Sequence, residues 1–507
     1  MSADRRVGMT RRQALLLAGA GAVSAGVGVA GLLRRWGSPP GGPLSSLSSE
    51  PGQTGSALRE PESIASQGGG LHVTLTAAAG RVDLAGRSVR ALSYNGSVPG
   101  PTLRLRPGDR VTLDLENRLA AGTNLHVHGL HVSPEGNSDN VFVHVEEGET
   151  FRYEYEIPRD HPAGTFWYHP HLHGLVADQL FGGMAGAIVI ERDDSVSLPV
   201  DRERMLVVTD VTLDGDRVAH VSMRDRIMGR EGDLVLVNGQ LEPTVTMAPG
   251  GREHWRLINA CTSRFLRLRT DGAELLQIAG DAGPLAEPTP VERVLLAPGN
   301  RTELLVQVPE PGRHRLLGEP VDRGVAGMGG MGGMGGMMRG RAAGGETTVT
   351  LLHVEASGQA VQPAELPRRL AELDDLRGLD LDRERRLTMT MTMGMGRGVG
   401  FAIDGKEFDA ARVDTTVRLG TVEEWTIIND SPMDHPFHLH VWPMQVLARD
   451  GRPVNGGPQW LDVVNVAARA SVTVRVRIND FPGRTVYHCH ILDHEDLGMM
   501  GVVDATG

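Results

Sequence analysis

Cysteine is scarce in this sequence, with only Cys261 and Cys489 in 507 residues. A framework of several disulfides is therefore excluded, and one disulfide is the most that the chain can form. Cys261 lies in the apolar run LINACTSRFLRL, where we expect a buried small residue. Cys489 stands between two histidines, and this position favours metal binding over a disulfide with Cys261.

Long hydrophobic runs are absent beyond the N-terminal segment, so no later segment is expected to span a membrane. At the N-terminus, Thr10-Arg11-Arg12-Gln13 precedes an uncharged Ala/Gly/Val/Leu stretch that extends to Leu33. Residues 1–36 therefore resemble a twin-arginine export signal, and the alternatives are an ordinary secretory signal or a short membrane anchor. We expect export by the twin-arginine machinery to the periplasm or the extracellular space.

Positive charge is also in deficit, since the formal net charge is −12. Residues 1–36 contribute +5, so the remainder carries −17. This balance disfavours nucleic acid and anionic membranes as partners. The hydrophobic share of 40% is ordinary for a soluble globular protein, and the length predicts about three domains.

Short alternating runs dominate the chain after a stretch rich in Ser, Gly and Pro. Residues 37–69 form that stretch and are predicted to be a flexible linker. Alternation as in PTLRLRPGDRVTLDLEN is typical of half-buried strands, and many such strands predict antiparallel sandwiches or barrels. The texture recurs in three blocks, which predicts domains at 70–195, 196–357 and 386–507, with a connecting segment at 358–385.

A repeated phrase supports internal repetition. Glu253-His254-Trp255 leads to Asn259 in the second block, and Glu424-Trp425 leads to Asn429 in the third. Asn117, after VTLDLE in the first block, is the predicted counterpart.

Histidines are arranged in His-x-His pairs more often than chance allows. Random placement of the 19 histidines would give about 0.7 such pairs, whereas five occur. Residues i and i+2 of a strand face the same way, so each pair directs two imidazoles to one point. The pairs are 126/128, 169/171, 171/173, 438/440 and 488/490.

The last cluster indicates the metal. If His488 and His490 point to one face, Cys489 points to the other. A thiolate, two histidines and a weak thioether are the ligands of a blue-copper site, and His494 and Met499 follow Cys489 within one loop. His435 stands at odd spacing from His438 and His440, so it is expected to face Cys489. The pairs 438/440 and 488/490 then supply four imidazoles to the other face, and the pairs 126/128 and 169/171 supply four more, which gives eight, enough for a three-copper cluster.

Four motifs, NLHVHG, GTFWYHPHLHG, HPFHLH and YHCHILDHEDLGMM, resemble in order the copper motifs of the multicopper oxidases. The resemblance extends from about Leu71 to the C-terminus. It implies three consecutive cupredoxin-like Greek-key domains in an all-β chain, and four copper ions. The implied ligands are His435, Cys489, His494 and Met499 for type 1 copper, His126 and His438 for type 2, and His128, His169, His171, His440, His488 and His490 for the type 3 pair.

The resemblance also implies proton-relay acids near the cluster. Glu495, directly after His494, matches one family position, and Asp139 is the candidate for a second. Asp178 is a further candidate, and each acid has the alternative of being a solvated surface charge. His173, which extends the HPHLHG run, is expected to support a ligand rather than to be one.

The substrate is indicated by methionines, because thioethers are soft ligands that select Cu(I). Residues 325–340 form a Gly/Met loop that includes Met328, Met331, Met334 and Met337, and a second run holds Met389 to Met395. Met433 and Asp434 precede His435 and are further candidates for binding the substrate. The alternatives are a flexible low-complexity loop, and a strand with outward methionines.

These patterns predict a copper oxidase that transfers electrons from its substrate to dioxygen and forms water. Cu(I) is the favoured substrate, and a laccase acting on phenols and aromatic amines is the alternative. A periplasmic copper-binding or copper-tolerance protein without turnover is the alternative from another class. It would use the methionines but would have no need of the His-Cys-His arrangement.

Overall fold

The computed structural model describes residues 52–192, 198–324, 347–394 and 398–507. The predicted signal (1–36), residues 37–51 of the predicted linker and the methionine-rich loop (325–340) lie outside these ranges. Among the described residues, no helix has the length and apolar character needed to cross a membrane.

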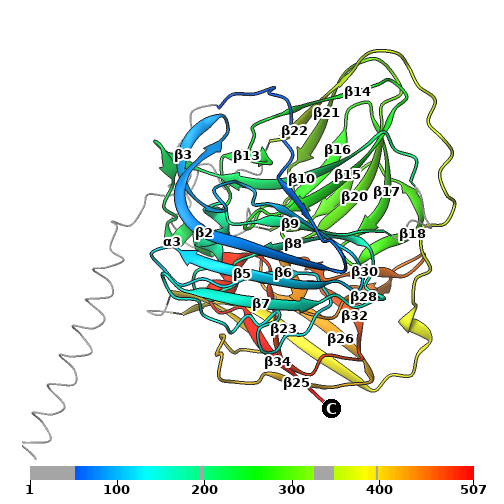
Figure 1. Ribbon diagram of the computed structural model, residues 1–507. Helices are drawn as coiled ribbons and strands as arrows, with labels where there is room; N and C mark the ends of the chain where they lie inside the picture. Colours follow the sequence, from blue (N-terminus) through cyan, green and yellow to red (C-terminus); the bar gives the residue numbers. More distant parts are fainter. Residues whose placement is uncertain (1–51, 193–197, 325–346, 395–397) are drawn as a thin grey trace, which may run out of the picture.

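The fold is all-β with three cupredoxin-like domains, as predicted. Six sheets form three pairs, one pair for each domain (Figure 1). In Figure 1 the green strands of domain 2 lie above the blue and cyan strands of domain 1, and the orange and red strands of domain 3 lie below.

Domain 1 consists of a sheet with the order β11-β12-β3-β2-β5-β7 and a sheet with the order β1-β4-β9-β8-β6. Its own strands are β1 (Ser63–Ala65), β2 (Gly70–Leu84), β3 (Arg87–Tyr94), β4 (Thr102–Leu105), β5 (Arg110–Arg118), β6 (His126–His128), β7 (Thr150–Glu156), β8 (Gly164–His169) and β9 (Gly186–Ile190).

Domain 2 consists of sheets with the orders β13-β10-β15-β20-β17-β18 and β14-β22-β21-β16-β19, and its short β11 and β12 join the first sheet of domain 1. The strands are β10 (Arg202–Val211), β11 (Leu213–Asp214), β12 (Arg217–Val218), β13 (Leu234–Val237), β14 (Thr244–Met247), β15 (Arg252–Asn259), β16 (Leu266–Thr270), β17 (Glu274–Gly280), β18 (Gly283–Pro290), β19 (Val294–Leu296), β20 (Arg301–Gln307), β21 (Gly312–Glu319) and β22 (Val349–Ala356).

Domain 3 consists of a sheet with the order β24-β23-β26-β32-β28-β29, with β30 also on β28, and a sheet with the order β25-β34-β33-β27-β31. The strands are β23 (Arg383–Gly394), β24 (Gly398–Ile403), β25 (Thr415–Arg418), β26 (Thr421–Asp430), β27 (His435–Leu439), β28 (Met444–Arg449), β29 (Arg452–Pro453), β30 (Gln459–Leu461), β31 (Val463–Val466), β32 (Ser471–Ile478), β33 (Gly483–Cys489) and β34 (Met500–Thr506).

Alternation along the strands builds the cores. In β5, Val111, Leu113 and Leu115 are buried while the residues between them are partly exposed, and β32 repeats this pattern. Each domain has its own apolar cluster at the centre of its two sheets. Period-two alternation in these strands thus puts one face into a core and leaves the other partly exposed, whereas strands such as β8 and β15 are buried on both faces.

The repeated asparagines hold equivalent positions in the three domains. Asn117, Asn259 and Asn429 lie at or near the ends of β5, β15 and β26. The side-chain oxygen of each accepts a hydrogen bond from the backbone N–H two residues on, and each amide donates to backbone carbonyls. Each asparagine therefore closes the same turn, and Asn117 is the predicted counterpart.

The glutamate of the repeated phrase needs a correction in the third block. Trp255 donates its indole N–H to Glu253, whereas Trp425 donates to Glu423, so Glu423 and not Glu424 is the counterpart of Glu253. Two residues along a strand face the same side, so only Glu423 can reach the Trp425 ring from the same face.

Residues 52–69 are not a flexible linker, contrary to the composition-based prediction. The backbone of Gln53 donates to Ala85, and that of Leu58 donates to Thr244. β1 then pairs in parallel with β4. A segment without an apolar period can still be fixed by backbone hydrogen bonds to neighbouring strands. At the other predicted connection, β23 begins at Arg383 rather than at residue 386.

Short helices lie where the domains meet. They are α2 (Val176–Phe181), α3 (Met223–Met228) and α4 (Leu492–Asp496), and a 3-10 turn, η3 (Leu376–Gly378), precedes β23. α4 packs against both α2 and α3. The Asp496 carboxylate accepts backbone N–H groups of Gly174, Val176 and Ala177, which joins the start of α2 to domain 3.

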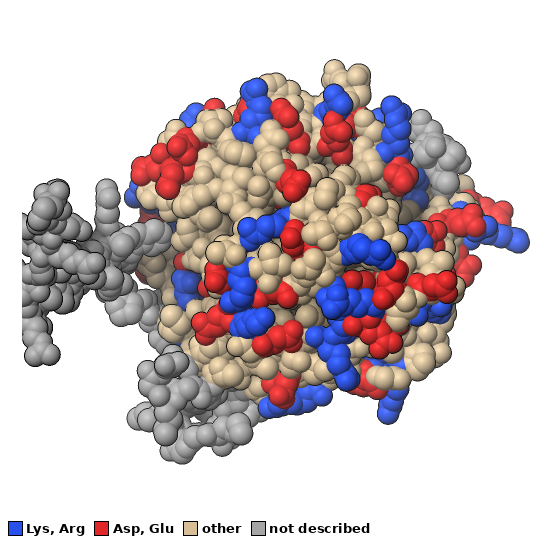
Figure 2. Space-filling view, turned by 90° about the horizontal axis from the view of Figure 1, so that it is seen from below, with Lys and Arg blue, Asp and Glu red and all other residues tan. Residues whose placement is uncertain are grey.

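The surface charges are mixed. Figure 2 shows acidic and basic side chains interspersed across the face of the molecule seen from below. The net negative charge of the chain therefore does not gather on this face.

Candidate metal centre

Two adjacent strands of domain 3 sort the candidate ligands onto two faces. β27 and β33 are antiparallel, with Phe437 opposite Cys489 and His438 opposite His488. His435 and Cys489 consequently point into one side of the sheet, while His438 and His488 point to the other. This is the division that the odd spacing of His435 predicts.

The first set of ligands, named here the Cys489 group, consists of His435, Cys489 and His494. The Cys489 Sγ lies 3.3 Å from Nδ1 of His435 and 3.9 Å from Nδ1 of His494, and these two nitrogens are 3.3 Å apart. All three side chains are fully buried. One thiolate and two imidazoles converging in this way could hold a single metal ion.

Neighbouring groups orient the ligands of the Cys489 group. His494 donates from Nε2 to the backbone carbonyl of Ile227 in α3, which leaves its Nδ1 lone pair facing Cys489. The Phe401 ring stacks on His494 with the ring centroids 4.2 Å apart. Met499 is fully buried in the same core, and its backbone carbonyl accepts the N–H of Cys489.

The second set is the eight-histidine group, which lies between domain 1 and domain 3. Every member is buried. Domain 1 contributes from β6, β8 and the loop after β8, and domain 3 from the region of β27 and β33. The members are His126, His128, His169, His171, His438, His440, His488 and His490.

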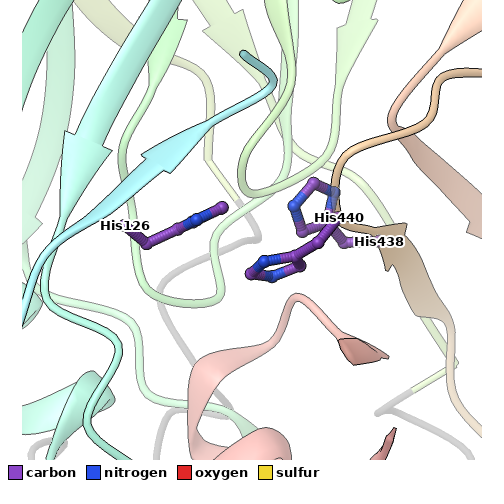
Figure 3. Close-up of side chains that lie close together, drawn as sticks. All are labelled: His126, His438 and His440. Carbon is purple, nitrogen blue, oxygen red and sulfur yellow. The ribbon is translucent and has the colours of Figure 1, made fainter. Parts of the chain in front are cut away.

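The rings of the eight-histidine group face a common centre. The Nε2 atom of His488 lies 3.1 Å from that of His171 and 3.0 Å from that of His440. Figure 3 shows His126 approaching His438 and His440 from the opposite domain. The potential ligand atoms of these three residues all lie within 4.8 Å of one another.

The pattern of hydrogen bonds in the eight-histidine group is the one expected for metal ligands. The Nε2 atoms of His126, His169 and His438 are buried and have no hydrogen-bond partner among the described residues. On each of these rings a carboxylate or a backbone carbonyl holds the other nitrogen, Nδ1, at 2.8–3.0 Å. Buried polar atoms are rarely left unpaired, and a ring held at one nitrogen presents the other to a metal.

The protonation states also fit metal binding. Burial lowers the pKa of His169 to about 3 and that of His435 to about 3. Burial, together with the neighbouring His435, also puts the pKa of His494 well below its ordinary value. These imidazoles are therefore neutral near pH 7 and offer lone pairs, as metal ligands must. Burial raises the pKa of the Cys489 thiol, so a bound cation is required to hold it as a thiolate.

Two of the predicted acids lie at the eight-histidine group. Both oxygens of Asp139 are 3.0 Å from Nδ1 of His126, and burial raises the pKa of Asp139 to about 8. Glu495 is fully buried, with Oε2 3.1 Å from Nδ1 of His488 and Oε1 3.6 Å from Nδ1 of His171. Burial alone would raise the pKa of Glu495, but His171 and His488 outweigh it and lower the value to about 2.

Family models described as multicopper oxidase match residues 76–195, 203–316 and 379–506, which together are well over half of the chain. The chain belongs to the multicopper oxidase family.

Several relatives of this multicopper oxidase are similar over most of its length. "Multicopper oxidase mco" of Staphylococcus aureus is 28% identical over 446 residues, covering 85% of this chain and 88% of that protein. A laccase of Bacillus stratosphericus is 28% identical over 480 residues, covering 81% and 90%. The structure of a Campylobacter jejuni multicopper oxidase, described as a metallo-oxidase, is 30% identical with a TM-score of 0.80, covering 91% and 97%.

The chain is also similar to proteins whose names refer to cell division. "Cell division protein FtsP" of Proteus mirabilis is 26% identical over 426 residues, covering 81% of this chain and 84% of that protein. Family membership supports an oxidoreductase and implies copper as the metal. A thiolate with imidazoles in the Cys489 group, and imidazoles in the other group, suit copper.

Two candidates of the sequence analysis need correction in this multicopper oxidase. The carboxylate of Asp178 pairs with Arg226 and Arg230 rather than facing the eight-histidine group. His173 is exposed, and its ring packs against Phe408 instead of supporting a ligand. The role of Asp434 in substrate binding stays a prediction; its carboxylate accepts hydrogen bonds from Asn465 and from the backbone of Ala468.

The methionines predicted to bind the substrate are either at least partly buried or outside the described residues. Met433 is fully buried beside His435. Met389 of β23 is fully buried and Met391 packs partly buried against the core of domain 3, so the alternative of a strand with outward methionines is wrong at these positions. Met328, Met331, Met334 and Met337 lie outside the described residues.

Sequence reasoning missed two buried acids, Asp462, which contacts this centre, and Asp493, which is next to the candidate ligand His494 in the sequence. Asp462 accepts from Nε2 of His128 at 3.1 Å, and its backbone carbonyl accepts from Nδ1 of His438. Asp493, which precedes His494, forms a buried ion pair with Arg230. A lone acid inside QWLDVVNV is the only sequence signal for Asp462, since charged residues are rarely buried without a partner.

We expect Arg230→Ala to destabilise the multicopper oxidase by about 3–5 kcal/mol, because it leaves the Asp493 carboxylate buried without its partner. Arg226→Ala is the matched control. Its pair with Asp178 is partly exposed (22% and 41%), so about 1 kcal/mol at most is expected. Melting temperatures of the two variants test this, and equal losses would contradict the special role of the Arg230–Asp493 pair.

Proposed function

We propose that the protein is a copper oxidase that couples one-electron oxidation of a substrate, preferably Cu(I), to the four-electron reduction of dioxygen to water. One observation carries the proposal. His488-Cys489-His490 supplies Cys489 to one buried ligand group and its two neighbours to the other. The two groups are thus joined covalently, which gives an electron a short path between them.

Four copper ions are proposed, with the ligands distributed as the family motifs imply. The Cys489 group with Met499 would hold type 1 copper, and the eight-histidine group would hold type 2 copper and the type 3 pair. Copper bound there would accept single electrons and deliver them to dioxygen. The chain itself holds the imidazoles neutral and aimed at the centre, and it excludes water, since every ligand side chain is buried.

Protons for water formation are proposed to pass through Glu495 and Asp139. Each carboxylate touches a ligand histidine of the eight-histidine group without being needed as a ligand itself. Asp139 also accepts the backbone N–H of Val127, which holds it in place. A positioned carboxylate that takes and gives a proton is the usual device for such a step.

The preference for Cu(I) rests on the methionines at 328–337 and on the described residues that precede them in the chain. The last of these, Arg323 and Gly324, lie against Pro432 to Asp434, and the N–H of Asp434 donates to the Arg323 carbonyl. Arg323 and Gly324 are therefore close to the residues that precede His435 of the Cys489 group. A similar structure is described as a metallo-oxidase, which also supports metal-ion oxidation.

Oxidation of phenols and aromatic amines is the second candidate, supported by the relatives named laccase. We further propose that the protein is exported by the twin-arginine machinery to the periplasm or the extracellular space, where copper homeostasis would be its role. The loss of export on replacing Arg11 and Arg12 by lysines, with the protein retained in the cytoplasm, would test this; continued export would contradict it.

Replacing Met328, Met331, Met334 and Met337 by leucines tests the substrate preference while keeping the loop length. We expect the KM for Cu(I) to rise about tenfold or more, because soft ligands are lost, with phenol oxidation unchanged. Oxygen uptake with each substrate is measured on copper-loaded protein. Equal kinetics in variant and wild type would favour the laccase alternative, and no uptake with any substrate would favour a copper-binding protein without turnover.

A further inference from the structure

Domain 2 supplies none of the twelve candidate copper ligands, yet one of its turns contacts the eight-histidine group. The turn precedes β20 and includes Gly299, whose φ is 89°. A Cβ at this position would lie 2.9 Å from the His490 ring. The close approach and the positive φ both require glycine here, so domain 2 is fitted directly against a ligand.

The next residue but one, Arg301, connects all three domains. It is fully buried, and all five of its guanidinium N–H groups have an acceptor. Nε donates to the Thr165 carbonyl of domain 1, and the terminal nitrogens donate to the Gly299 and Asp281 carbonyls of domain 2. The remaining two donors bind both oxygens of Asp462 in domain 3, at 2.7 and 2.6 Å.

Asp462 carries this connection to the copper ligands. Its Oδ1 accepts a hydrogen bond from Nε2 of His128 at 3.1 Å. Since Nε2 then bears the proton, Nδ1 of His128 is left with a lone pair, and it lies 3.3 Å from Nε2 of His490. The His128 and His438 rings also stack, with centroids 4.0 Å apart, so both rings depend on the position of Asp462.

The residue after His128 confirms that space is reserved for this ion pair. Gly129 has a φ of 84°. A Cβ there would meet Nη2 of Arg301 at 2.4 Å and Oδ2 of Asp462 at 2.5 Å. The glycine of the NLHVHG motif therefore makes room for the arginine of domain 2.

The buried charges of Arg301 and Asp462 each need the other as a partner. Asp462 is nearly fully buried, and a buried carboxylate without a partner is strongly disfavoured. A second acid, Asp281, also contacts Arg301, because its Oδ1 accepts the backbone N–H of Arg301. Because an arginine fork binds both carboxylate oxygens at once, it fixes the rotation of Asp462 as well as its charge.

We propose that Arg301 is a positioning residue for the copper cluster in the eight-histidine group. It fixes Asp462, and Asp462 fixes the tautomer and the ring orientation of His128. The ligand-free domain 2 thereby determines how domains 1 and 3 present their histidines to one cluster. This inference rests on the proposed function, since it concerns the proposed type 2 and type 3 copper.

Arg301→Lys tests the inference, because it keeps the charge and removes the fork. Arg256→Lys is the matched control, since Arg256 is also buried in domain 2 and is paired with Glu303, away from the ligands. Copper per chain, the blue absorption of the Cys489 group and the near-ultraviolet absorption of coupled type 3 copper are recorded for both variants and the wild type.

We expect Arg301→Lys to retain the blue absorption and to bind copper at the eight-histidine group about 10–100-fold more weakly, with loss of the near-ultraviolet absorption. The Arg256→Lys control retains both. Asp462→Asn, which keeps the shape, is expected to reproduce the loss if Arg301→Lys does not fold. Two results would overturn the inference: Arg301→Lys matching the control, or both absorptions falling together in a variant whose circular dichroism shows that it is folded. If the wild type shows neither absorption, the proposed function fails instead.

Discussion

A Cys489→Ser variant is expected to bind copper at the eight-histidine group, to lack the blue absorption, and to consume no oxygen with any substrate. Cys489 is the only cysteine beside His435 and His494, since the other cysteine lies in the core of domain 2. A serine hydroxyl does not replace a thiolate as a soft ligand at this site. The loss of turnover should exceed the ~10–100-fold effect of removing a partner of a ligand.

Cys261→Ser is the control for this experiment. Cys261 is as deeply buried as Cys489, but it belongs to the core of domain 2. Its Sγ lies 3.8 Å from the Val208 carbonyl oxygen. We expect it to stay blue and active. A colourless Cys261 variant, or a Cys489 variant that still takes up oxygen, would contradict the assignment of the Cys489 group.

Glu495→Gln is expected to retain copper and colour but to slow oxygen-dependent turnover by about 10²–10⁴-fold, the usual contribution of a positioned acid or base. The amide keeps the shape of the side chain beside His171 and His488, but it cannot take up and release a proton. Reduction by substrate should therefore proceed normally, while reoxidation by dioxygen becomes slow. Stopped-flow absorption measures the two halves separately.

Asp496→Asn is the matched control, since Asp496 is the neighbouring acid in α4 and binds the backbone of α2 rather than a histidine. The oxygen of the asparagine can still accept the N–H groups of Gly174 and Val176, so normal reoxidation is expected. If both variants reoxidise at the wild-type rate, Glu495 does not carry the protons.

The sequence was sufficient for the sandwich architecture and for the division of the ligands. Both depend on a side-chain period of two, which holds along any strand regardless of its partners. His435 and His438 differ in parity, so their opposite faces follow before any fold is known. The period does not say which face is inside, and for this reason it left open whether Met389 points outward or into the core.

The contacts between domains could not be predicted from the sequence. Arg301 and Asp462 are separated by 161 residues, and neither belongs to a histidine motif. Their meeting depends on how three separately folded sandwiches dock, which no local pattern records. Residues 52–69 escaped prediction for a related reason, because backbone pairing with β4 requires no apolar period.

The most direct test of the central claim is the absorption spectrum of the copper-loaded protein, recorded together with oxygen uptake on addition of Cu(I) and then of a phenol. We predict a blue protein that consumes one dioxygen for every four electrons supplied, without release of hydrogen peroxide. A colourless protein that binds copper yet takes up no oxygen would contradict the account and leave a copper-binding protein built on an oxidase fold.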